Sequence, residues 1–137
     1  MTLIDSNILI DILGGDPHWS ERSVRSLSAC ARRGPIAIND VVYAELAAGF
    51  ASQAQLDDEL AAMRLKIAPM SKAALFLAGQ AFRRYREGGG MRPNVLADFF
   101  IGAQASVEGW PILTRDERRY RAYFPDVALV STEAAGT

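Results

Sequence analysis

Four acidic residues lie in, or directly after, stretches of the sequence that are otherwise hydrophobic. Asp5 ends the run Met-Thr-Leu-Ile-Asp, and Glu45 and Asp98 each interrupt a run of aliphatic and aromatic residues. Asp116 follows the run Pro-Ile-Leu-Thr-Arg. A carboxylate that is taken out of water is costly unless its charge is compensated. Any fold built on these runs must therefore bring compensating charge to acids spread over the whole chain.

The size and composition of the chain indicate one globular domain. Its 137 residues fit a single domain and leave little room for two. Half of the residues are hydrophobic and 23% are charged, which is ordinary for a globular protein and excludes a disordered chain. We predict that residues 1–131 form the domain and that residues 132–137 form a flexible tail.

The distribution of charge leaves two interpretations open. The formal net charge is −1, which gives no overall attraction to nucleic acid. Between residues 83 and 121, however, eight arginines face five acids, a local charge of +3. The planar fork of arginine suits phosphate oxygens. The same arginines could also be no more than solvated helix faces.

The cysteine count and the amino terminus favour a cytoplasmic protein. Cys30 is the only cysteine, so an intrachain disulfide is excluded and a reducing compartment is expected. The chain opens on a strand-like run without a charged leader, so no signal peptide is predicted. No apolar run approaches membrane-spanning length, and we expect no membrane association.

Short apolar runs alternate with longer helical patterns along the chain. Strands are predicted at residues 3–4, 35–39, 66–69, 111–114 and 127–130. Helices are predicted at residues 7–13, 20–33, 40–48, 53–64, 71–86, from 94 onward and 115–122. We expect Asp40, Ser71 and Asn94 to be the N-caps of three of these helices.

This alternation predicts an α/β fold with a parallel sheet covered by helices on both faces. Asp5 and Asp116 then lie at the carboxyl ends of strands, and Glu45 and Asp98 lie in the early turns of helices. Strand ends and helix starts share one edge of such a sheet, where ligands bind. The four acids can therefore meet in one crevice although 40, 53 and 18 residues separate them in sequence.

The four acids differ in how strongly their neighbours in the sequence indicate a functional role. Asp98 is flanked by Val95 and Ile101 and followed by two phenylalanines, so it has few routes to bulk water. Glu45 has valines one turn before it and Ala-Gly one turn after it, so an apolar helical face is expected. Asp116 lies among charged residues and gives the weakest signal.

Each acid also has a purely structural interpretation that the sequence leaves open. Asp5 could cap the following helix, and Asp98 could be an acid favoured by the helix dipole. Glu45 could be buried against an arginine, and Asp116 could form a surface ion pair. The other aspartates in exposed-looking positions are interpreted as structural: Asp11, Asp16, Asp57, Asp58 and Asp126.

Four convergent carboxylates limit the chemistry to a few classes. They would repel one another unless a divalent cation neutralised them, and hard oxygen ligands favour Mg²⁺ or Mn²⁺. Such ions can activate water for phosphodiester hydrolysis. A metal-free carboxylate pair, as in glycoside hydrolysis, is the other option. His18 is the only histidine, which argues against a His-based triad or a zinc site.

Four motifs contain the acids, and their order and spacing are more specific than any one of them. They are Leu-Ile-Asp-Ser-Asn-Ile-Leu-Ile-Asp at residues 3–11, Val-Tyr-Ala-Glu-Leu at 42–46, Leu-Ala-Asp-Phe-Phe-Ile-Gly-Ala at 96–103 and Leu-Thr-Arg-Asp at 113–116. With these motifs the sequence resembles the PIN-domain ribonucleases, and among them the VapC-like toxins of bacterial type II toxin–antitoxin pairs.

The resemblance implies a parallel sheet of about five strands and an endoribonuclease that uses Mg²⁺ or Mn²⁺. It implies that a metal-activated water hydrolyses RNA, with transfer RNA among the candidate substrates. It also implies a homodimer and a cognate antitoxin that blocks the crevice. The predicted catalytic and metal-binding residues are Asp5, Glu45, Asp98 and Asp116. Ser6, Asn7 and Thr114 are predicted to support them, and Arg92 and Arg115 are candidate RNA contacts.

Two other functions compete with this one. A PIN-like fold could keep the acids yet only bind nucleic acid or a protein partner, without catalysis. A receiver-type phosphoacceptor domain also gathers acids at strand ends, but it needs a lysine near the late strands. Lys66 and Lys72, the only lysines, come too early in the chain, so this second option is disfavoured.

Overall fold

The structure is a computed structural model of the chain, and it describes residues 1–92 and 96–132. Five strands alternate with seven helices in this part of the chain. The strands are β1 (Thr2–Ile4), β2 (Ile36–Ile38), β3 (Leu65–Ile67), β4 (Ile112–Thr114) and β5 (Leu129–Ser131). The helices are α1 (Ser6–Gly14), α2 (Ser20–Arg33), α3 (Asp40–Ala47), α4 (Gln53–Ala62), α5 (Lys72–Glu87), α6 (Leu96–Glu108) and α7 (Arg118–Tyr123).

The strands form one parallel sheet in the order β3-β2-β1-β4-β5, which confirms the predicted fold class. β1 is the central strand and pairs with β2 on one side and with β4 on the other. Leu3 lies opposite both Ala37 and Ile112, so the three strands end at nearly the same level. The chain order reverses between β1 and β4, and such a switch point opens a crevice at the carboxyl ends of the strands.

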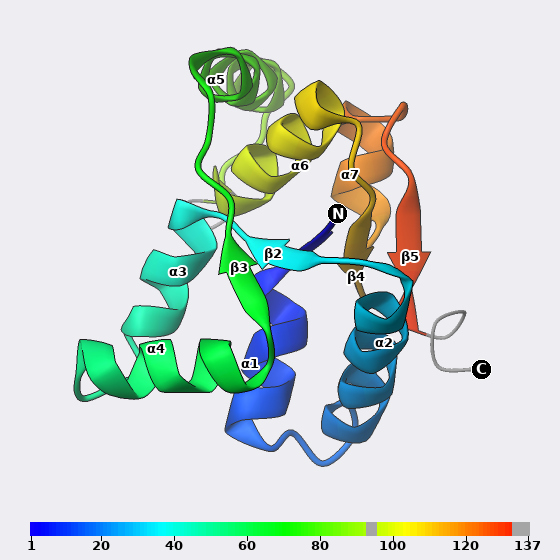
Figure 1. The fold of residues 1–137 in the computed structure, drawn as a ribbon. Coiled ribbons are helices and arrows are strands. Elements are labelled where there is room, and N and C mark those ends of the chain that lie inside the picture. The colour runs from blue at the N-terminus through cyan, green and yellow to red at the C-terminus, as the bar shows by residue number, and fades with distance from the viewer. Residues whose placement is uncertain (93–95, 133–137) are drawn as a thin grey trace.

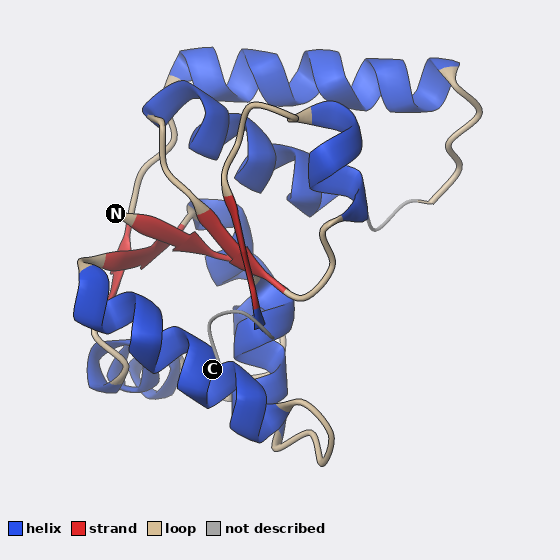
Figure 2. Ribbon diagram, turned by 90° about the vertical axis from the view of Figure 1, so that its right-hand side faces the viewer, coloured by secondary structure: helices blue, strands red, loops and turns tan. Residues whose placement is uncertain are grey.

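Helices cover both faces of the sheet (Figures 1 and 2). α5, α6 and α7 lie above the sheet, and α1, α2 and α4 lie below it (Figure 2). α3 contacts a helix of each layer, α1 and α6. The strands are buried between these layers, and they read as short aliphatic runs because parallel strands covered on both faces need apolar side chains on both sides.

The core joins the central strands to the first helix and to an aromatic cluster. The largest fully buried side chains are Leu3, Ile4, Ile8, Leu9, Ile36, Ile38, Leu56, Phe99, Ile101, Ile112, Leu113 and Tyr120. On the upper layer, Phe99 packs its ring against Phe82, Tyr85, Tyr123 and Phe124. This cluster holds together α5, α6, which carries Asp98, and α7, which carries Tyr120. No helix in the described residues is both long and apolar enough to cross a membrane.

Two local expectations need correction. Asn39, not Asp40, caps α3, because its Oδ1 accepts the Val42 N–H at 2.9 Å and the helix already begins at Asp40. The helix after β4 begins at Arg118 rather than at Arg115. Thr132, the first residue of the predicted tail, is buried, and its carbonyl accepts a hydrogen bond from Ser26.

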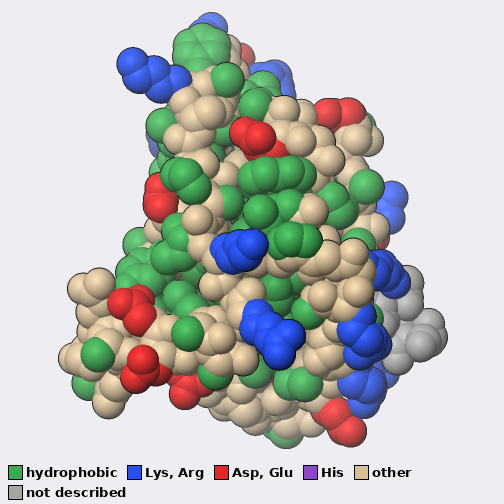
Figure 3. Space-filling view, in the orientation of Figure 1, with side chains coloured by type: hydrophobic (Ala, Val, Ile, Leu, Met, Phe, Trp, Pro, Cys, Tyr) green, Lys and Arg blue, Asp and Glu red, His purple; other side chains and the backbone are tan. Residues whose placement is uncertain are grey.

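One predicted helix cap is confirmed, and other local predictions fall outside the described residues. Ser71 caps α5 as expected, since its Oγ accepts the Ala74 N–H at 3.1 Å. The predicted cap at Asn94 and the rest of the predicted tail lie outside the described residues. Hydrophobic side chains gather over α6 and beside α3 on the face shown in Figure 3. The exposed hydrophobic residues include Leu75 and Phe76 on α5 and Val107 on α6, whereas Phe82 packs inside the aromatic cluster.

Two glycine-to-alanine variants test the packing of the upper layer. A Cβ at Gly102 of α6 would lie 2.3 Å from Cδ2 of the buried Phe124 ring, so Gly102→Ala should lower the free energy of unfolding by about 1–3 kcal/mol. Gly79 is exposed on α5 with open space around it, so Gly79→Ala should raise that free energy by up to about 1 kcal/mol. Urea denaturation measures both, and a stabilising effect of Gly102→Ala would contradict this packing.

Candidate functional site

Asp5 lies at the switch point, immediately after β1, and its side chain is 3% exposed. Its backbone N–H donates to the Leu113 carbonyl, which fixes it beside the end of β4. Its Oδ2 accepts hydrogen bonds from Thr114 Oγ1 at 2.8 Å and from Tyr120 Oη at 2.9 Å. Burial raises the pKa of Asp5, and these two hydroxyl donors partly oppose that rise.

The structure argues against Asp5 as only a helix cap. The residue occupies the N-cap position of α1, but its side chain makes no capping hydrogen bond there. Its oxygens face the hydroxyls of β4 and α7 instead. The three predicted supporting residues lie around it: Ser6 Oγ donates to Asp5 Oδ1 at 3.4 Å, and Asn7 Nδ2 contacts both Asp5 and Thr114. These contacts show a carboxylate held in one orientation.

Asp98, in the first turn of α6, is a second and partly buried carboxylate. Its pKa rises to about 6, chiefly because burial disfavours the charged form and then because Asp5 lies near. The Arg119 guanidinium of α7 forms an ion pair with Asp98 and opposes this rise, and the charge of Glu45 adds to it. The Arg119–Asp98 pair is about one-quarter exposed, so solvent screens it only in part.

Glu45 comes from α3 and completes a group of three interacting acids. Its pKa is raised by burial first and by the charge of Asp5, while a hydrogen bond with Ser6 lowers it. Glu45 is nevertheless the most exposed of the three, which corrects the expectation of an apolar helical face. Val42 and Leu46 are buried, but Ala48 and Gly49 are exposed, so the face carrying Glu45 borders on solvent.

Asp116 stands apart from this group. It is exposed, its carboxylate accepts the backbone N–H of Arg118 at 3.4 Å, and its own N–H donates to Thr114 Oγ1. Thr114 therefore connects Asp116 to Asp5 through one hydroxyl. The structure thus brings Asp5, Asp98 and Glu45 into electrostatic contact and leaves Asp116 at the rim.

The donor types of the site fit a hard divalent cation, although the side chains are not gathered tightly. Within residues 1–92 and 96–132, no three Asp, Glu, His or Cys side chains lie close enough together to form a ready-made metal site. Asp5 nevertheless raises the pKa of both Glu45 and Asp98, and Glu45 raises that of Asp98, so a cation among them would be stabilised. Asn7 Oδ1, next to Asp5, is a buried acceptor without a hydrogen-bond partner in the described structure. Asp98 would have to exchange Arg119 for the cation.

Arg115 is held by a residue that looks exposed in the sequence. Asp11 is 2% exposed, and Arg115 binds it with two hydrogen bonds, from Nε at 2.8 Å and from Nη2 at 3.1 Å. Ser23 also donates to Asp11, and the Arg115 guanidinium lies 5.0 Å from the centre of the Trp19 ring. Asp11 is therefore structural as predicted but buried, and the engaged guanidinium argues against Arg115 as an RNA contact.

Tyr120 is the site residue that the sequence does not single out. It lies between arginines, where a packing role is expected, yet its ring is buried and its hydroxyl reaches Asp5. Burial and the nearby Asp5 raise the pKa of Tyr120 well above its usual value, so the hydroxyl stays protonated and donates. The one signal in its favour is that a buried tyrosine hydroxyl needs a partner.

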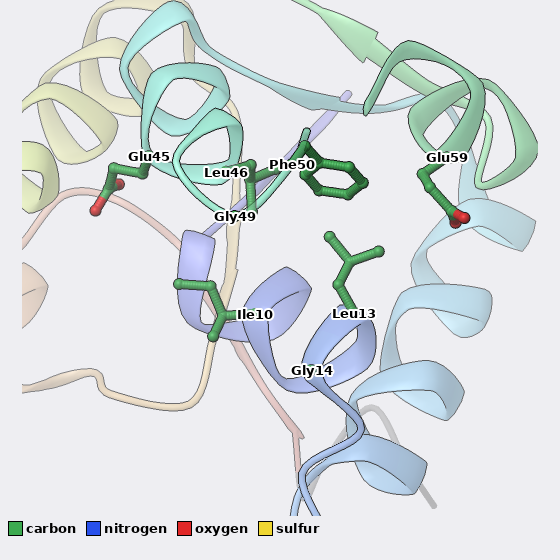
Figure 4. Close-up of a pocket in the computed structure, with 8 residues that line it drawn as sticks. All are labelled: Ile10, Leu13, Gly14, Glu45, Leu46, Gly49, Phe50 and Glu59. Carbon is green, nitrogen blue, oxygen red and sulfur yellow. The ribbon is translucent and has the colours of Figure 1, made fainter. Parts of the chain in front are cut away.

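A groove lies beside Glu45, between α1, α3 and α4. Its volume is about 380 Å³, and its lining is mostly apolar. Figure 4 shows Ile10, Leu13 and Phe50 along the groove, with Glu45 and Glu59 at opposite ends and the Glu45 carboxylate pointing away from Leu13 and Phe50. The groove therefore combines an apolar centre with an acid at each end.

Tyr120→Phe tests whether the buried hydroxyl matters to cation binding. The variant keeps the ring but removes one of two strong donors to Asp5, so Mn²⁺ affinity measured by calorimetry should fall about tenfold or more. Tyr43→Phe is the matched control, because Tyr43 also donates to a carboxylate, Asp57, but on the surface. Equal Mn²⁺ affinity for wild type and Tyr120→Phe would contradict the assignment.

Comparison with solved structures shows the same fold in several proteins. VapBC2 from Rickettsia felis bound to a promoter DNA fragment has a chain with 22% identity and a TM-score of 0.71, covering 95% of this chain and 97% of that one. A chain of FitAcB from Neisseria gonorrhoeae has 24% identity and a TM-score of 0.67, covering 97% of this chain and 99% of that one. A chain of a toxin–antitoxin complex from Klebsiella pneumoniae has 22% identity and a TM-score of 0.68, covering 96% of this chain and 98% of that one. At these identities the likeness shows the fold.

A comparison with curated proteins finds no match. The family comparison is decisive in a way that the structural likeness is not. The PIN domain matches residues 2–125, a range that contains the four predicted acids, Tyr120 and every strand except β5. The chain therefore belongs to the PIN-domain family.

Proposed function

We propose that this protein is a metal-dependent endoribonuclease and acts as the toxin of a toxin–antitoxin pair. The observation that carries the proposal is the buried Asp5 at the switch point of the sheet, with Asp98 and Glu45 close enough to interact with it electrostatically. PIN domains are typically nucleases, and the sequence motifs of this chain resemble those of VapC-like toxins. The site therefore has the acids, the place in the fold and the family expected of such an enzyme.

Asp5, Asp98 and Glu45 would hold the cation, and Asp116 would complete the site from the rim. Mg²⁺ or Mn²⁺ would supply Lewis acidity and neutralise phosphate charge. Thr114 and Tyr120 keep Asp5 in one orientation by donating to the same oxygen. Asn7 offers a further buried acceptor beside Asp5. The protein would therefore hold the side chains that bind the cation in place before RNA binds.

The attacking group in this reaction would be water. Cys30 is buried in α2, and His18, the only histidine, is exposed in the segment between α1 and α2. Ser6 donates to Asp5, so its hydroxyl lies beside a carboxylate rather than beside an imidazole base. None of these three side chains is therefore placed for covalent catalysis at the acids.

Arg119 is expected to change partner during the reaction. In this structure its guanidinium neutralises Asp98, and its position over the Tyr85 ring, 5.8 Å from the ring centre, steadies it. With a cation bound at Asp98, the guanidinium of Arg119 would be released and could bind a phosphate oxygen of the RNA as its new partner. One arginine can therefore stabilise the carboxylate without the cation and the RNA with it.

The proposed partners are an antitoxin and a second copy of the chain. The Klebsiella pneumoniae structure similar to this chain is described as a toxin–antitoxin complex. The apolar groove next to Glu45 suits an antitoxin segment that carries apolar residues between basic ones, because Glu45 and Glu59 lie at its ends. The exposed Leu75 and Phe76 of α5 support a homodimer.

One observation favours the alternative, a PIN-like module that binds without catalysis. Arg119 occupies Asp98, and no three candidate ligands in the described residues are gathered for coordination. If the arginine never leaves Asp98, RNA or a protein could bind with no turnover. Tight RNA binding without cleavage in Mg²⁺ or Mn²⁺ would identify this alternative.

Asp98→Asn tests the nuclease directly. The amide keeps the shape of the side chain but removes the charge that a cation needs, so cleavage of total cellular RNA in Mg²⁺ or Mn²⁺ should fall at least about 100-fold. Asp58→Asn, on the exposed face of α4, is the control and should cleave like wild type. Full activity of Asp98→Asn, or cleavage that persists with a chelator, would refute the proposal.

The raised pKa of Asp98 predicts how cation binding depends on pH. Below pH 6 the carboxyl is increasingly protonated, so a cation must displace a proton, and Mn²⁺ affinity should fall by up to about tenfold per pH unit. Above about pH 7 the group is already ionised and affinity should level off. Calorimetry across this range measures the effect, with thermal melts to show that the protein stays folded. Constant affinity from pH 5 to 7.5 would be inconsistent with this pKa.

A further inference from the structure

A second cavity opens beside the acids and is lined mainly by arginine and tyrosine. Its volume is about 320 Å³, and we call it the arginine pocket. Asp116 forms part of its wall, and Arg119 connects it to Asp98. The pocket therefore shares two residues with the surroundings of the candidate site. Its lining residues are Tyr85, Arg92, Asp116, Arg118, Arg119 and Tyr123.

Tyr85 of α5 organises one side of the pocket. Its hydroxyl accepts the backbone N–H of Arg92 at 3.1 Å. Gly90 lies directly on the Tyr85 ring, since a Cβ there would be only 2.4 Å from the ring carbons. The loop after α5 descends from the end of that helix (Figure 2), and its contacts with Tyr85 place Arg92 at the pocket.

The aromatic rings of the pocket are already in use. Tyr85 contacts Phe82, Phe99 and Tyr123, and the Arg119 guanidinium and Gly90 approach the same ring. Tyr123 packs edge-to-face against Phe99. A nucleotide base that stacked here would have to displace these neighbours. The rings are therefore supports for the arginines rather than free stacking platforms.

Two of the three guanidinium groups of the pocket form no ion pair with a residue that the structure describes. Arg119 is paired with Asp98, but neither Arg92 nor Arg118 forms an ion pair with any residue that the structure describes. The one acid of the lining, Asp116, accepts the backbone N–H of Arg118 rather than its guanidinium. The pocket therefore contains two guanidinium groups without an ion pair among the described residues and one that is already paired. The described part of its lining contains only one carboxylate.

We propose that the arginine pocket binds a backbone phosphate of single-stranded RNA, next to the bond that is cut. This inference rests on the proposed nuclease function and assigns a substrate subsite to it. Arg92 and Arg118 provide forked donors that fit phosphate oxygens, and Tyr85 and Tyr123 complete the neutral part of the lining. Because the rings are covered, the pocket reads the backbone and tolerates any base.

The test is a binding measurement with cleavage blocked by a chelator. A labelled single-stranded oligoribonucleotide of mixed sequence is titrated with wild type, with the double variant Arg92→Ala/Arg118→Ala, and with Arg32→Ala/Arg33→Ala. The last is the matched control, because Arg32 and Arg33 are exposed in the last turn of α2 and change the charge equally. Thermal melts establish that all three proteins are folded.

The pocket variant should bind RNA at least about tenfold more weakly than wild type at moderate salt, since two charge-assisted contacts are lost. Its affinity should also depend less on salt, with the slope of log affinity against log salt reduced by about 0.7 for one phosphate contact on a single strand. The control variant should show neither change beyond a small loss of general attraction. Equal losses in the two variants, or none in the pocket variant, would overturn the proposal.

Two further probes separate recognition of the phosphate from recognition of a base or of an acidic peptide. An abasic oligomer with the same number of phosphates should show the same loss in the pocket variant, and no loss would refute a phosphate site. A glutamate-rich peptide of equal charge should bind wild type more weakly than RNA does. Equal binding that depends on the same arginines would identify a site for an acidic protein and would also overturn the proposal.

The cleavage assay with Mg²⁺ keeps the two proposals distinct. If wild type cleaves RNA but the pocket variant binds and cleaves like wild type, the nuclease stands and the subsite is refuted. If wild type cleaves nothing in any metal but the pocket variant loses RNA binding, the subsite stands and the nuclease is refuted. A raised KM with little change in kcat in the pocket variant supports both.

Discussion

The burial of one carboxylate, Asp5, at the carboxyl end of the central strand is the constraint on which the rest of the site depends. Its position follows from strand register, because the Asp5 N–H continues the pairing of β1 with β4. The fold tolerates this buried carboxylate because two hydroxyls donate to one of its oxygens. They belong to Thr114 at the end of β4 and to Tyr120 in α7. Without both elements in place, a buried aspartate would destabilise the fold.

The other charged groups are arranged around that residue. Asp98 and Glu45 enter from α6 and α3, and their pKa values are raised first by burial and then by the charge of Asp5. Arg119 reduces this cost at Asp98, and the Tyr85 ring supports the Arg119 guanidinium. The same tyrosine holds Arg92 through its hydroxyl. The acids and the arginine pocket are thus parts of one charge distribution, in which α7 and the loop after α5 place arginines beside acids from the end of β1, α3 and α6.

Much of this can be predicted from the sequence, because it depends on local patterns. The alternation of short apolar runs with helices predicts the parallel sheet, and acids inside apolar runs identify Asp5 and Asp98. The errors arise where a distant contact decides. Asp11 looks exposed in a helical pattern, but Arg115, 104 residues later, pairs with it and buries it. Tyr120 looks like a packing residue, and only the placement of α7 brings its hydroxyl to Asp5. Glu45 borders on solvent because the rest of the protein covers its face of the helix less completely than the neighbouring valines predict.

The buried acids at the switch point are proposed to hold a divalent cation, and every catalytic role assigned here depends on that cation. The most direct test is anomalous diffraction from a crystal of the protein soaked in Mn²⁺. The account predicts a manganese peak between Asp5 and Asp98, with Arg119 moved off the Asp98 carboxylate. A crystal with no peak there, and with Arg119 still bound to Asp98 at saturating Mn²⁺, would contradict it and would favour a PIN domain that binds its partners without catalysis.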